Sequence, residues 1–172
     1  LRGLGGIYPV NGMYIRPLLC VGRKEIEDYL KGREMPYCID ATNMEDAYMR
    51  NRIRNHVIPY FKENINEKTV EHMNRSMDQL REIWDYMERQ TESAYQICTD
   101  QNGEKICIHA DAYHRQERLI RKMILRKALV LVAEHEKDLE QVHVEKLEGL
   151  FEKQVGKRLD LPYAVCACRT YE

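Results

Sequence analysis

The sequence has the length of one ordinary domain, or of one domain joined to part of another: it contains 172 residues, 44% hydrophobic and 32% charged. Lysine and arginine number 27 against 28 aspartate and glutamate residues, so the net charge excludes a global field that attracts nucleic acid. The chain begins at Leu1 without a signal segment and has no apolar run near the roughly eighteen residues of a membrane span; we expect a cytoplasmic protein with no membrane partner, excised from a longer chain.

The N-terminal segment predicts short elements separated by loops. Residues 2–12 are rich in glycine and predict a loop. Residues 14–19 predict an extended segment, because Pro17 disfavours helical angles in the residue before it. Apolar positions three and four residues apart predict a helix over residues 23–30, and residues 37–39 predict a second short extended piece.

A second helix is predicted around the spacing Thr42-x-x-Glu45, which is that of a capping box. We expect this helix to begin there and to end or kink near Ile58, because Pro59 cannot donate a backbone hydrogen bond. Residues 64–66 then separate it from the next element.

The remainder of the chain predicts a mainly α fold with short β segments. Residues 67–98 form a long amphipathic helix whose apolar face we expect to be buried along its length; the face consists of Val70, Met73, Met77, Leu80, Trp84 and Met87. The other expected elements are a turn at 101–103, a short strand or extended arm over 105–109, helices over 113–134 and 142–154, and a closing hairpin of 158–162 with 164–168. On the helix over 113–134 the expected buried residues are Leu119, Ile120, Met123, Ile124 and Val130.

Three arginines, Arg50, Arg52 and Arg54, stand within five residues and have no acid among them. Successive residues of a helix turn by about 100°, so Arg50 and Arg54 lie on neighbouring ridges while Arg52 points elsewhere. A guanidinium is the preferred fork for phosphate or carboxylate. On composition alone, however, we favour a solvated or interdomain face paired with acids such as Glu45 and Asp46.

A second basic group lies on the helix predicted over 113–134. Arg115, Arg118, Lys122 and Arg126 are spaced by three, four and four residues and share an arc of roughly 80° on a continuous helix. Such a stripe suits the phosphates of an RNA stem. Glu117 interrupts it, and long basic side chains also cover apolar surface with their stems, so the stripe alone leaves both interpretations open.

Other kinds of site find no support in the sequence. The six cysteines include no C-x-x-C pair and the six histidines no H-x-x-x-H pair, so we expect reduced thiols and no metal site. Neither G-x-S-x-G nor a glycine-rich phosphate cradle is present. We therefore expect this chain not to bind or hydrolyse ATP unaided.

Five segments, in order and spacing, resemble the tRNA(Ile)-lysidine synthases. They are Arg2-Gly-Leu-Gly-Gly-Ile7, Ile15-Arg-Pro-Leu-Leu19, Arg23-Lys-Glu-Ile26, Asp40-Ala-Thr-Asn43 and Tyr48-Met-Arg-Asn-Arg-Ile-Arg54. The specific part is Asp-x-Thr-Asn followed by Arg-Asn-x-x-Arg. Residues 115–129, 143–147 and 156–162 also resemble that family's arginine-rich helix and its next helix and strand.

The resemblance implies that residues 1–64 are the C-terminal part of an adenylating α/β domain of the N-type ATP pyrophosphatase fold, and that residues 65–172 are a helical domain that binds tRNA or substrate. It implies a ligase that adenylates the wobble cytidine of tRNA(Ile) with ATP and Mg²⁺ and lets the amine of lysine displace AMP. The family's Ser-Gly-Gly-x-Asp-Ser loop and its acidic and histidine motif are absent from this chain. We expect both motifs, and the catalytic residues, upstream of Leu1, so that this chain alone is inactive.

The resemblance also changes the interpretation of the arginine cluster. It implies that Arg50 and Arg54 contact the activated nucleotide, ATP phosphates or tRNA backbone. It also implies that Asp40, Thr42 and Asn43 shape a helix start whose backbone N–H groups favour an anion. Alternatively, Thr42 serves only as a helix cap. The positions implied for substrate, nucleotide or tRNA binding are Asp40, Thr42, Asn43, Arg50, Asn51, Arg52 and Arg54. Those implied for tRNA backbone contact are Arg115, Arg118, Lys122 and Arg126.

Two alternatives remain open at this point. A tRNA-thiolating ATP pyrophosphatase has a similar acid-x-Ser/Thr-Asn pattern, but it needs reactive cysteines or an iron–sulfur site, for which this sequence has no suitable spacing. A noncatalytic helical interaction module would instead bind no tRNA at low salt. The sequence leaves the oligomeric state open, a homodimer included.

Overall fold

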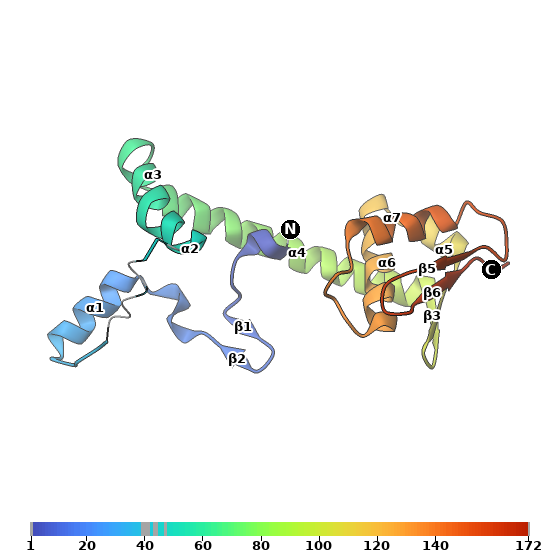
Figure 1. The fold of residues 1–172 in the computed structure, drawn as a ribbon, viewed down its shortest axis with the longest axis horizontal. Helices are drawn as coiled ribbons and strands as arrows, with labels where there is room; N and C mark the ends of the chain where they lie inside the picture. Colours follow the sequence, from blue (N-terminus) through green and yellow to red (C-terminus); the bar gives the residue numbers. More distant parts are fainter. Residues whose placement is uncertain (1, 39–41, 43–44, 47, 172) are drawn as a thin grey trace. The chain divides into compact units, whose positions relative to one another are not determined.

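The computed structural model describes residues 2–38, 42, 45–46 and 48–171, and the chain packs as two compact units, Leu1–Trp84 and Asp85–Glu172 (Figure 1). The division falls within one helix, α4 (Thr69–Cys98). The expected mostly helical fold with short strands is confirmed.

Unit 1 consists of short elements followed by the first part of α4. In chain order they are η1 (Arg2–Gly5), β1 (Val10–Asn11), β2 (Tyr14–Ile15), η2 (Pro17–Cys20), α1 (Arg23–Gly32), α2 (Met49–Arg52), the π-helical segment η4 (Ile53–Val57) and α3 (Ile58–Asn64). The helix expected over residues 23–30 is confirmed by α1. The extended segment expected over residues 14–19 is wrong in its second half, because Pro17, with its fixed φ, starts the 3-10 helix η2.

The helix that contains Pro59 differs from the expectation at both ends. The α-helix begins at Met49, after an extended Tyr48, and not near Thr42; the Glu45 N–H donates to the Thr42 carbonyl at 3.1 Å. It also continues past Ile58, because the π-helical segment η4 precedes Pro59. A π turn is wider than an α turn and relieves the clash of a proline ring with the preceding turn.

The glycine-rich start of the chain packs against α4. Arg81 on α4 donates from Nε to the carbonyl oxygen of Gly5 at 2.6 Å and from Nη2 to that of Ile7 at 3.0 Å. A Cβ at Gly5 would lie 3.0 Å from Cγ of Arg81, and Gly6 has a φ of +69° with its missing Cβ 3.0 Å from Sδ of Met77. Close approach and a left-handed backbone explain why glycine stands at both positions.

Unit 1 lacks a buried apolar core among its described residues. The described positions classed as buried there are Gly5 and Asn51, and no hydrophobic side chain of the unit is among them. The predicted apolar face of α4 is wrong for its first turns: Val70 is 37% and Met73 52% exposed. Within α4 the buried positions are instead Thr91, Ala94, Tyr95 and Cys98, which belong to unit 2.

Unit 2 packs its helices and two hairpins around one main core. After α4 its elements are β3 (Thr99–Asn102), β4 (Lys105–Ile108), α5 (Ala110–His114), α6 (Arg118–Ala133), α7 (Gln141–Leu150), β5 (Arg158–Asp160) and β6 (Cys166–Cys168). Ile124 and Leu125 of α6 are 0% and 1% exposed, and burying each such side chain contributes about 1.5 to 3 kcal/mol. The core also contains Ala94, Tyr95 and Cys98 from α4, Tyr113 from α5 and Val144 from α7.

Both hairpins are antiparallel. In the first, Thr99 pairs with Ile108 and Asn102 with Lys105; β4 confirms the predicted strand, whereas its partner β3 was not predicted. In the second, Leu159 pairs with Ala167, which confirms the closing hairpin.

The helix expected over residues 113–134 is in fact two helices. α5 ends at His114 and α6 begins at Arg118, because Glu117 before it has an extended ψ of 145°. Tyr113, at the end of α5, is fully buried and stacks on Phe151 with a centroid distance of 4.4 Å. Leu119 is 51% exposed, so its expected burial is wrong, whereas Ile120 and Ile124 are buried as expected.

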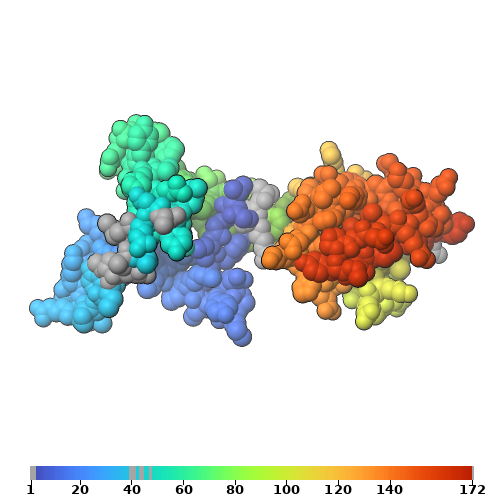
Figure 2. All heavy atoms as spheres, in the orientation of Figure 1, coloured from blue at the N-terminus to red at the C-terminus, as the bar shows by residue number. Residues whose placement is uncertain are grey.

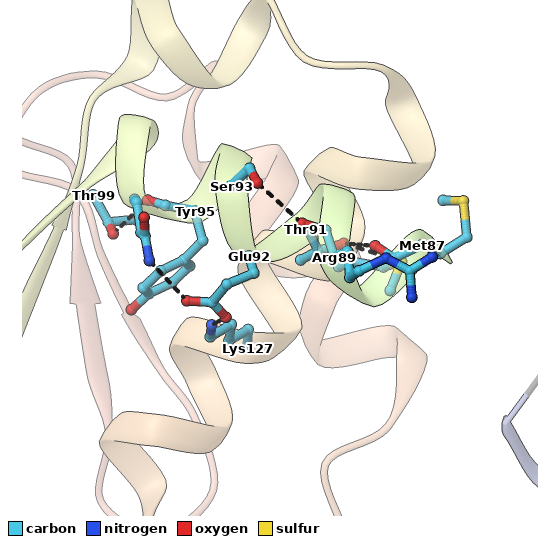
Figure 3. A network of polar contacts seen from close by, with 10 residues as sticks. Met87, Arg89, Thr91, Glu92, Ser93, Tyr95, Thr99 and Lys127 are labelled. Atoms are coloured by element: carbon cyan, nitrogen blue, oxygen red, sulfur yellow. Dashed lines mark hydrogen bonds and ion pairs between the residues drawn. The ribbon is translucent and has the colours of Figure 1, made fainter. Parts of the chain in front are cut away.

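A polar network joins α6 to α4 (Figure 3). Lys127 donates to the Glu92 carboxylate and lies 4.5 Å from the ring centroid of Tyr95. The hydrogen bond and charge of Lys127 lower the pKa of the Glu92 carboxyl below its ordinary value. Nearby, Thr91 and Thr99 donate to the α4 carbonyls of Met87 and Tyr95 (Figure 3).

Candidate functional site

The arginine cluster lies on α2 and η4 in unit 1. Arg50, Arg52 and Arg54 are all exposed, while Asn51 between the first two is buried; this segment is drawn in cyan at the surface in Figure 2. Within the described part of the chain Arg50 and Arg52 form no ion pair, and the carboxylate of Asp46 contacts the imidazole of His56 at 2.6 Å. The alternative, in which the cluster is paired with Glu45 and Asp46, therefore finds no support for Arg50 and Arg52.

The residues that the resemblance implied before this helix are only partly described. Asp40 and Asn43 lie outside the described residues. The Thr42 carbonyl oxygen accepts a hydrogen bond from Asn51 Nδ2 at 2.9 Å. The same Nδ2 donates to the Glu45 carbonyl at 2.8 Å. The structure thus brings Thr42 and Asn51 together beside the arginines, and the α-helix that carries the arginines begins at Met49.

Arg54 is oriented by its neighbours on the same helix. Its Nη2 donates to Oδ1 of Asn51 at 3.2 Å and its Nε to Oδ1 of Asn55 at 3.4 Å. A guanidinium held in this way loses less conformational freedom when it binds an oxyanion. Exposed guanidiniums at Arg50, Arg52 and Arg54 are chemically suited to phosphate or carboxylate groups.

The basic stripe expected in unit 2 is divided by the break between α5 and α6. Arg115 follows α5 and is not part of α6, so the four residues do not share one helical arc. Arg118 is exposed in the first turn of α6. Lys122 lies 4.0 Å from Glu145 of α7, and Arg126 donates to the Leu139 carbonyl at 2.9 Å. The stripe is therefore partly engaged within the unit, and Arg118 is its most accessible cation on α6.

Unit 2 also contains a small hollow that the sequence did not indicate. It has a volume of about 220 Å³ and lies between the strands β4 and β6. Its lining includes Ile106, His109, Leu125, Phe151, Cys168 and Arg169. The lining residues come from segments that lie much farther apart in the sequence than the window over which periodicity gives a signal. No sequence motif therefore marks the hollow.

The described residues contain no group of three or more His, Cys, Asp or Glu side chains arranged to hold a metal ion. No described helix is long and apolar enough to cross a membrane.

Comparison with known proteins first gives a class. Residues 1–61 match the model of the PP-loop domain family, so the N-terminal part of the chain is similar to PP-loop ATP-binding domains. The arginine cluster lies inside the matched region.

The chain as a whole is similar to tRNA(Ile)-lysidine synthases, which confirms the resemblance seen in its motifs. It is 40% identical over 171 residues to the enzyme of that name from Caldanaerobacter subterraneus subsp. tengcongensis, covering 99% of this chain and 37% of the relative. The enzymes from Clostridium perfringens and Geobacter sulfurreducens are 33% and 31% identical, covering 99% and 98% of this chain and 36% of each relative. The chain thus spans little more than a third of the length of these relatives.

Proposed function

We propose that this chain is a segment of a tRNA(Ile)-lysidine synthase, in which residues 1–64 complete the adenylating domain and residues 65–172 form a helical domain that contacts tRNA. In the whole protein the C2 carbonyl oxygen of the wobble cytidine attacks the α-phosphate of ATP and pyrophosphate leaves. The amine of lysine then attacks C2 and displaces AMP. The observation that carries this chain's share of the proposal is the exposed arginine cluster within the region similar to a PP-loop domain.

The packing of unit 1 supports its place in a larger domain. Met13 is 90%, Ile15 73% and Leu18 62% exposed, and apolar surface on this scale is typical of a face that packs against another part of a protein. The remainder of an ATP pyrophosphatase domain would cover such a face.

For Mg²⁺, the described residues contain no cluster of three or more His, Cys, Asp or Glu side chains arranged to hold an ion. We therefore assign no Mg²⁺ ligand to this chain and derive no step through the ion. What the chain contributes to ATP or tRNA is the positive charge of its exposed arginines, with Arg50 and Arg54 as the residues we expect to contact phosphate oxygens.

In unit 2, Arg118 is the residue that we expect to meet the tRNA backbone most directly. Arg115 is exposed on the preceding turn and adds a second charge. Lys122 lies 4.0 Å from Glu145, and Arg126 donates to the Leu139 carbonyl. Both residues would add positive charge near the tRNA and also stabilise the fold.

Replacing Arg50 in the longer protein tests the proposal at the cluster. Arg50→Ala should lower lysidine formation at least about tenfold, because it removes one charge-assisted contact worth about 1.5 kcal/mol. The free energy of unfolding should change by less than about 0.5 kcal/mol, because Arg50 is exposed. Lys68→Ala, at an exposed position of the same unit, is the control. An Arg50→Ala variant with a lower Tm but an unchanged turnover per folded molecule would show that Arg50 is structural.

A further inference from the structure

We infer that Asn51 is a positioning residue: its buried amide ties the backbone of Thr42 and Glu45 to the helix that carries the arginine cluster, and it orients Arg54. The inference rests on the proposed function for the role of the arginines. It replaces the expectation that Asn51 itself contacts nucleotide or tRNA.

The hydrogen-bonding capacity of Asn51 supports a role within the fold. Its side chain is 9% exposed, and a buried amide must find partners for its two donors and its acceptor. Both donors are used, at 2.9 Å to the Thr42 carbonyl and 2.8 Å to the Glu45 carbonyl, and Oδ1 accepts from Arg54 at 3.2 Å. No donor of Asn51 is left to bind a phosphate.

The two carbonyls that Asn51 holds belong to one turn. The Glu45 N–H donates to the Thr42 carbonyl at 3.1 Å, so that this oxygen accepts from both Glu45 and Asn51. The next described residue, Asp46, is held by His56 at 2.6 Å. The turn is therefore fastened to the helix at two points.

The π-helical segment explains how two side chains of one helix, Asn51 and His56, both contact the same turn. On a regular α-helix, Asn51 and His56 would point about 140° apart, because each residue turns by about 100°. In η4 the Ile58 N–H donates to the carbonyl of Ile53, five residues earlier, and this wider turn brings residues five apart nearer to one face. Both side chains can then contact the same turn.

The consequence for the site is a fixed geometry. Loss of the Asn51 donors would release the turn that precedes the cluster and leave two carbonyls without this partner, while a carboxylate at the same position would still accept from Arg54. Asn51→Asp therefore separates the tie to the turn from the contact to Arg54. Asn74→Asp, at an exposed position on α4, is the matched control for the added charge.

Hydrogen exchange tests the tie directly. In the longer protein, Asn51→Asp should speed exchange of the Glu45 amide, which donates to the Thr42 carbonyl, by about tenfold, which corresponds to about 1.4 kcal/mol, with exchange in α6 unchanged. Asn74→Asp should leave the Glu45 amide as in the unmodified protein. Unchanged exchange of the Glu45 amide in folded Asn51→Asp would overturn the inference.

A double-mutant cycle tests the positioning role. Asn51→Ala, which removes the Oδ1 acceptor of Arg54 as well as both donors, should reduce lysidine formation in the unmodified background but much less in an Arg54→Ala background, because residues that act through one another are not additive. Fully additive effects would contradict it. If Asn51→Asp does not fold, Asn51→Ala, which also lacks both donors, takes its place in the exchange experiment. If the unmodified protein forms no lysidine, the proposed function fails, and the exchange result still decides whether Asn51 holds the turn.

Discussion

Arg126 on α6 donates a hydrogen bond from Nη1 to the carbonyl oxygen of Leu139 at 2.9 Å, and its Nη2 lies 3.4 Å from Glu136. Leu139 is 5% exposed and belongs to a second buried apolar cluster with Leu129, Ala133 and Leu161. This bond therefore holds the segment between α6 and α7 over that cluster. We expect Arg126→Gln to destabilise unit 2 by about 1 kcal/mol, or about 4 to 8 °C in Tm for a unit of this size. Thermal unfolding measures it, and an unchanged Tm would show that the bond contributes nothing.

Arg118, in contrast, should contribute to tRNA binding and not to the stability of unit 2. It is exposed in the first turn of α6, and if it meets an RNA phosphate, its loss should flatten the slope of log affinity against log salt by about 0.7 to 0.9. Binding of tRNA(Ile) and of an unrelated tRNA to Arg118→Gln should weaken similarly, because phosphate contacts carry little sequence information. A slope equal to that of the unmodified protein would return Arg118 to the interpretation of a solvated helix residue.

The Glu92–Lys127 pair predicts a contribution to stability that depends on pH. Because the pair lowers the pKa of Glu92 in the folded state, its contribution is present above the unfolded pKa, about 4.3, and is lost as pH falls through the folded value. Glu92→Gln should therefore be less stable than the unmodified chain at neutral pH, with the difference shrinking in acid.

Urea unfolding over a pH series checks this expectation. Glu88→Gln, one turn earlier on α4 and also exposed, is the control and should show no such convergence. A difference between Glu92→Gln and the unmodified chain that stays constant down to the lowest pH would contradict it.

Periodicity in the sequence was sufficient to predict several of the elements. The helices α1 and α4 and the strand β6 follow from the spacing of apolar residues within each segment, and such local patterns carry their own signal. The break between α5 and α6 was not predicted, because residues on both sides of it, Tyr113 and Ile120, are apolar at a spacing that also suits one continuous helix.

The candidate site shows the same limit. Composition and the family resemblance indicated the arginines, but the Thr42 capping box predicted a helix start that the structure places at Met49. What decides the geometry is a side chain reaching back from the helix, since Asn51 holds the carbonyls of Thr42 and Glu45. A single sequence does not distinguish a buried asparagine of this kind from an exposed one that binds a ligand.

The most direct test of the central claim is lysidine formation by the longer protein that contains this chain. Incubated with tRNA(Ile), lysine and ATP, it should convert the wobble cytidine to lysidine, detected by mass spectrometry of the digested tRNA, with AMP released in step. The 172-residue chain alone should release no AMP above a control without protein, because it has no glycine-rich phosphate cradle. Lysidine absent from the reaction of the folded longer protein, or AMP released by the isolated chain in the presence of tRNA and lysine, would contradict the account.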